Sequence, residues 1–109
     1  MRTATISVFV LALALMITPV AIQADALDDC PRVGAYIERV DHLAGRAAPI
    51  IRESGSRQAM ALLDAAVGEL RIAHRAYDAG QCRMAFSSVQ SAENMIQRAL
   101  SIIHRRSND

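Results

Sequence analysis

Hydrophobic residues recur at helical spacing along the chain after residue 30. Over residues 62–103 the apolar positions alternate steps of four and three, the period of an amphipathic helix with one buried face. The pattern is interrupted at Asp78-Ala79-Gly80-Gln81, where glycine can adopt the left-handed conformation that ends a helix. This stretch therefore predicts two helices folded back on each other.

A third helix is predicted before this hairpin, so that the helices lie at about 31–53, 57–79 and 81–104. Pro31 suits the first turn of a helix, because proline has no N–H group to leave unpaired there. Gly55 ends the first helix, and Ser56 can cap the second. Pro49 interrupts the first helix, and the sequence leaves open whether the helix kinks or breaks there.

Each predicted helix has an apolar face that would line a shared core. The expected core positions are Val33, Tyr36, Ile37, Val40, Leu43, Ala44, Ala47, Ile50 and Ile51 in the first helix, Ala59, Met60, Leu63, Ala66, Val67, Leu70, Ala73, His74 and Tyr77 in the second, and Ala85, Phe86, Val89, Ala92, Ile96, Ala99, Leu100 and Ile103 in the third. The connections are short, which makes neighbouring helices antiparallel. The predicted fold is an all-α, antiparallel up-down-up three-helix bundle.

The first 24 residues read as a secretory signal peptide. Arg2 is followed by a largely apolar run over residues 6–20 and then by small residues, with cleavage expected near Ala24 or Ala26. The run is shorter than the about 20 residues of a spanning helix, which argues against an uncleaved anchor. Residues 25–109 would then form a single helical domain, periplasmic or secreted, with no stable membrane anchor after cleavage.

The exported part of the chain keeps two cysteines, Cys30 and Cys82. An even number in a small secreted domain predicts a disulfide. No histidine or further cysteine stands at ligand spacing beside either, and neither lies in a C-x-x-C motif, which argues against a metal pair or reactive thiols. In an up-down-up bundle both cysteines begin helices at the same end, so the topology and the cysteine count agree.

Composition and motifs argue against most chemistries. The 12 basic residues, all arginine, nearly balance 11 acidic ones and are scattered without forming a patch, so no nucleic-acid partner is predicted. The sequence has no G-x-S-x-G, no Gly-rich phosphate loop and no H-E-x-x-H. We therefore predict that the protein is not an enzyme and has no catalytic residues.

Neither a metal nor another cofactor is predicted. His42, His74 and His104 would stand about 9 Å or more apart along the bundle, too far for one ion. We expect His74 to be satisfied by a nearby polar group instead. Met60 and His104 fall near the same end and could ligate haem, but there is no C-x-x-C-H motif and few aromatic residues. Met60 is therefore expected to fill the core.

The positive indication of function is a strip of apolar residues beyond those that the core needs. Met84, Met95 and Ile102 lie toward one edge of the third helix, and Ile72 lies on the outer side of the second. An exposed apolar strip favours contact with an unknown protein partner or with a second copy of the chain. The alternative is a ligand-binding bundle for haem, a metal or a small apolar molecule. A chaperone-like envelope protein is a third class, for which the sequence has no specific signal.

Overall fold

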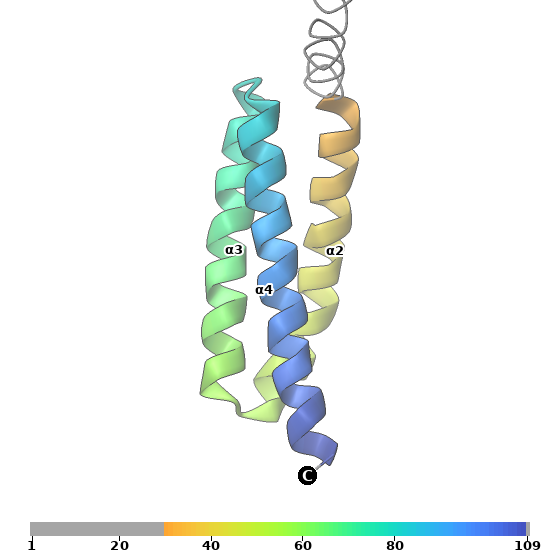
Figure 1. Ribbon diagram of the computed structural model, residues 1–109, viewed down its shortest axis with the longest axis vertical. Helices are drawn as coiled ribbons and strands as arrows, with labels where there is room; N and C mark the ends of the chain where they lie inside the picture. The colour runs from red at the N-terminus through yellow and green to blue at the C-terminus, as the bar shows by residue number, and fades with distance from the viewer. Residues whose placement is uncertain (1–29, 109) are drawn as a thin grey trace, which may run out of the picture.

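The computed structural model describes residues 30–108, which form three helices. These are α2 (Cys30–Ser54), α3 (Arg57–Asp78) and α4 (Cys82–Asn108), and each packs against the other two (Figure 1). The predicted all-helical class and the disulfide between Cys30 and Cys82 are confirmed. The predicted signal peptide lies outside the described residues. Within residues 30–108 no helix is both long and apolar enough to cross a membrane.

Local sequence signals set the ends of α2 and α3. Gly55 and Gly80 have φ angles of 70° and 76°, in the left-handed region that glycine tolerates. After α3, the Gln81 N–H donates to the Ala76 carbonyl at 2.8 Å and the Gly80 N–H donates to the Tyr77 carbonyl at 3.0 Å. This pattern satisfies the last carbonyls of the helix and turns the chain directly into α4.

Helix α3 has the predicted N-terminal cap. The Ser56 hydroxyl accepts the Ala59 N–H at 3.2 Å, which satisfies one of the N–H groups that a helix start leaves unpaired. Ser56 itself is buried, and the Ser54 hydroxyl accepts its N–H at 3.1 Å. The two serines thus hold the connection between α2 and α3 in one conformation.

Helix α2 runs through Pro49 without a break. Proline removes the bond that its N–H would make to the carbonyl of Gly45. Both residues are exposed, so water can satisfy that carbonyl. Of the two outcomes that the sequence left open, the break is excluded.

Alanines are prominent on the buried faces of α3 and α4, the helix pair with the most extensive contact. Three on each helix, spaced seven residues apart, are fully buried: Ala59, Ala66 and Ala73 on α3, and Ala85, Ala92 and Ala99 on α4. Side chains this small let two helix backbones approach closely along their whole shared length. The larger core residues are aliphatic, and Ile37, Ile51, Ile96, Val40 and Val89 are the largest that are fully buried.

Four residues expected in the core lie at the surface instead. Ile50 is 53% exposed, Phe86 45% and Met60 39%, and His74 is also exposed. The buried arc of α3 is centred on its alanines, which turns the larger Met60 side chain to the edge of the interface. In α2 the neighbouring Ile51 takes the buried position in place of Ile50. The expectation that Met60 fills the core is therefore wrong.

The last helix is longer than predicted and ends at Asn108. The Ser107 hydroxyl donates to the carbonyls of Ile103 and His104 at 3.1 Å, which supports the extra turn. Arg105 and Arg106 lie in this last turn, where positive charge is favourable beside the helix dipole. As a result α4 extends past the connection between α2 and α3 (Figure 1).

Candidate interaction surface

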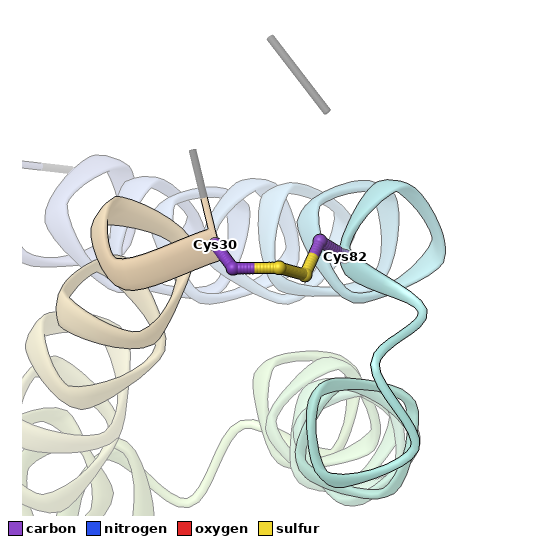
Figure 2. Close-up of a disulfide and its surroundings, with 2 residues drawn as sticks. All are labelled: Cys30 and Cys82. Carbon is purple, nitrogen blue, oxygen red and sulfur yellow. A yellow bond between two sulfur atoms is a disulfide. The ribbon is translucent and has the colours of Figure 1, made fainter. Parts of the chain in front are cut away.

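The disulfide joins the first turn of α2 to the first turn of α4, as Figure 2 shows. The Cα atoms of Cys30 and Cys82 are 5.6 Å apart, within the ordinary range for a disulfide. Cys82 is 6% exposed and Cys30 is half-buried. Both cysteines of the chain are consumed by this bond, which is placed as a structural link rather than as a reactive site.

The three residues of the predicted contact strip differ in exposure. Met84 is 52% exposed, whereas Met95 and Ile102 are half-buried, and Met95 also packs against the core. Their spacings of 11 and 7 residues are about three and two turns of helix, so the three side chains share one line along α4. We call Met84, Met95, Ile102 and the 44% exposed Ile72 of α3 the apolar strip.

The apolar strip lies on the side of α4 away from α2. Phe86 and Glu93 contact Tyr36 of α2, and residues two apart on a helix point in nearly opposite directions. Met84 and Met95 stand two residues from these contacts and therefore face the opposite side. Ile102 shares a groove there with Gln58 of α3. The three α4 residues of the apolar strip thus lie on the side of α4 near its junction with α3.

A polar and aromatic cluster holds α2 against the other side of α4. The Tyr36 hydroxyl donates to Oε1 of Glu93 at 2.7 Å, and the Tyr36 ring centroid is 5.8 Å from that of Phe86. The Arg39 guanidinium carbon lies 5.1 Å from the centroid of the Tyr36 ring, in cation–π geometry. Sequence analysis missed Glu93. Its position could have indicated the role. Glu93 stands seven residues after Phe86 and seven before Leu100, so it is a carboxylate on a helix face whose other members are apolar.

We predict that the Tyr36 phenol resists deprotonation in the folded protein. Burial, the hydrogen bond to Glu93 and the charge of Glu93 raise the pKa of Tyr36 from 10.0 to about 12, although Arg39 acts in the opposite direction. A raised folded-state pKa means that this stabilisation is complete below pH 10 and is lost as the pH rises through about 12. In a Tyr77→Phe variant, which leaves Tyr36 as the single tyrosine, phenolate absorbance should stay low at pH 10–11.

The matched variant adds Glu93→Gln to the same background. It removes the negative charge while keeping a hydrogen-bond acceptor of similar size, so Tyr36 should ionise at lower pH. A midpoint near pH 10 in the Tyr77→Phe protein, or no change on adding Glu93→Gln, would contradict the contact between Tyr36 and Glu93.

The expectation that a nearby polar group satisfies His74 is confirmed. Nε2 of His74 lies 2.7 Å from Oδ2 of Asp41, which joins α3 to α2. Both side chains are substantially exposed, so the pair contributes little to stability. His104 lies instead beside Asn108, with 3.2 Å between Nε2 and Nδ2. Over residues 30–108 no group of three histidine, cysteine or carboxylate side chains is placed to hold a metal ion.

A groove between the start of α3 and the end of α4 gathers arginines. Arg98, Arg105 and Arg106 line it, together with Gln58, Ser101 and Ile102. The expectation that the arginines form no patch is therefore wrong at this end of the bundle. The signal was present in the sequence, because spacings of seven and eight residues put the three arginines on one side of a helix.

No known protein family, curated protein or solved structure matches this chain. Two surfaces of the described residues remain without a structural explanation, namely the apolar strip and the arginine groove. The disulfide, the His74–Asp41 pair and the Tyr36 cluster all link helices of the bundle to one another. Those two surfaces are therefore the candidates for a functional contact.

Proposed function

We propose that this chain is a small exported helical-bundle protein that acts by contacting another protein and catalyses no reaction. We infer that the three helices form an antiparallel up-down-up bundle and that the bundle follows a signal peptide at 1–24, which is cleaved. It places the mature domain in the periplasm or outside the cell. A disulfide that joins two helices supports this location, because such bonds persist in oxidising compartments. The intact mass of the exported protein should correspond to a chain that begins near residue 25 or 27.

The observation that carries the proposal is the apolar strip along the junction of α3 and α4. Ile72 and Met84 are 44% and 52% exposed, although alanines of the same helices are fully buried. Burying large apolar side chains against a partner is favourable, at about 25 cal/mol per Å² removed from water. Methionine also adapts its shape to a partner surface, because its side chain is flexible and polarizable.

We predict that a photo-crosslinking amino acid at Met84 forms one discrete crosslinked product in the producing cell. The partner protein or a second copy of the chain would supply the contact, and the mass of the product tells the two apart. Ile50 is the matched control position, since it is 53% exposed but lies on α2, outside the apolar strip. Equal crosslinking at the two positions, or none at Met84, would show that the apolar strip is ordinary surface.

The same contact should be lost when Ile72→Glu and Met84→Glu are combined. Both side chains are exposed, so two carboxylates there should leave helix content and the unfolding midpoint nearly unchanged. Ile50→Glu adds a carboxylate at a similarly exposed position and should keep the contact. A double variant that stays folded and still crosslinks from Met95 would place the interaction elsewhere.

A further inference from the structure

The arginine groove concentrates positive charge at one place on the bundle. It has a volume of about 590 Å³ and is lined by three guanidinium groups, one hydroxyl, one amide and one apolar side chain, those of Arg98, Arg105, Arg106, Ser101, Gln58 and Ile102. Among residues 30–108 no carboxylate lines it. Within residues 30–108 none of the three guanidinium groups forms an ion pair. Three neighbouring like charges without a counter-charge repel one another, and a bound anion would remove that repulsion.

The remaining lining groups fit an oxygen-rich anion. Gln58 lies in the first turn of α3, where backbone N–H groups carry partial positive charge. The Ser101 hydroxyl and the Gln58 amide can both donate hydrogen bonds. Guanidinium groups match the oxygen geometry of phosphate, which they bind with two parallel hydrogen bonds. The described residues of the groove therefore supply the donors for a phosphate group and no negatively charged acceptor.

We propose that this groove binds a phosphate-bearing anion through Arg98, Arg105 and Arg106. Ile102, half-buried in its wall, would contact an apolar part of the same ligand. A phospholipid headgroup and a soluble phosphate compound share this chemistry. The groove adjoins the apolar strip, because Ile102 belongs to both, but the three arginines that define the groove are not part of the strip.

The experiment measures binding of the mature, disulfide-bonded protein to two probes. One is inorganic pyrophosphate, followed by calorimetry and by shifts of the arginine Nε–Hε signals in NMR spectra. The other is vesicles of phosphatidylglycerol, compared with vesicles of phosphatidylcholine. Binding of pyrophosphate identifies a soluble phosphate as a sufficient ligand, and binding of the anionic vesicles alone identifies a lipid headgroup. If the protein binds neither probe, the proposal is overturned.

Two variants of equal charge separate a site from general electrostatic attraction. Arg98→Gln/Arg105→Gln/Arg106→Gln should weaken binding by about tenfold or more, because charge-assisted hydrogen bonds are lost. Arg46→Gln/Arg71→Gln/Arg83→Gln removes three exposed arginines elsewhere and should change it by less than about twofold. Equal losses in the two variants overturn the site. Should the groove variant fail to fold, Arg105→Gln alone is compared with Arg71→Gln, and unequal binding is again required.

The two proposals fail independently. Ile72→Glu/Met84→Glu leaves all three groove arginines in place, and the groove variant leaves the exposed part of the apolar strip intact. Loss of phosphate binding with the Met84 crosslink retained is therefore the expected result for the groove variant. If the groove variant abolishes both, the arginines belong to the protein contact and the phosphate site is wrong.

Discussion

Removing the disulfide by Cys82→Ser is expected to lower the free energy of unfolding by about 2–4 kcal/mol. The bond joins residues separated by 52 positions, so it closes most of the described helical region into one loop in the unfolded chain. A loop of that length restricts the unfolded ensemble strongly in the chain-entropy description. Net stabilities of small domains are only about 5–15 kcal/mol, so this loss would be a large share.

Urea unfolding followed by circular dichroism measures the effect. Reduction of the unmodified protein is the matched control, since it opens the bond without changing the buried Cys82 side chain to serine. The two routes should give similar losses, and Cys30→Ser/Cys82→Ser should add little to Cys82→Ser alone. Thiol titration of the denatured, unreduced protein should find no free sulfhydryl. Two free thiols in protein from its own compartment would contradict both the bond and its contribution.

Enlarging an alanine between α3 and α4 is the second change with a large expected effect. Ala66 on α3 is 0% exposed, as are Ala85, Ala92 and Ala99 on α4, and α3 and α4 have the most extensive contact of the three helix pairs. Ala66→Leu adds three carbon atoms where the close backbones leave no space. Overpacking of this kind typically costs about 1–3 kcal/mol, and more where helices cannot separate. The short turn between α3 and α4 opposes such a separation.

The control is Ala61→Leu, the same substitution on the exposed side of the same helix. Alanine and leucine have similar helix propensities, so the control should stay within about 0.5 kcal/mol of the unmodified protein. For a domain of this size each kcal/mol corresponds to a shift in melting temperature of about 4–8 °C. Similar melting temperatures for the two variants would show that α3 and α4 are not in close alanine contact.

The helices could be predicted because their signals are local. Gly55, Ser56 and Gly80 stop and start helices through their own backbone and side-chain chemistry, whatever the rest of the chain does. The disulfide could be predicted because two cysteines allow one pairing. Pro49 could not be decided in the same way, since a helix continues through proline when the unpaired carbonyl reaches water.

The exposure and the contacts of the candidate surface residues depended on tertiary structure more than the helix boundaries did. The spacing of Met84, Met95 and Ile102 showed that they share a line, and their place at the edge of the core followed from the same period. How much of each side chain is exposed depends on the neighbouring helix, and here Met95 packs partly into the core while Met84 does not. The role of Glu93 depended on Tyr36, a residue 57 positions away in the sequence.

Periodicity, capping residues and cysteine number thus determined from the sequence alone that this is a helical protein with one disulfide. Only the packing decided how far each helix is rotated about its axis. A helical period defines an apolar arc wider than any one neighbour can cover, so large and small residues of the arc compete for the buried centre. On α3 and α4 the alanines occupy the most buried positions, because close approach of two helix backbones requires small side chains. That rotation moved Met60 to the surface and left the apolar strip at the edge of the α3–α4 junction.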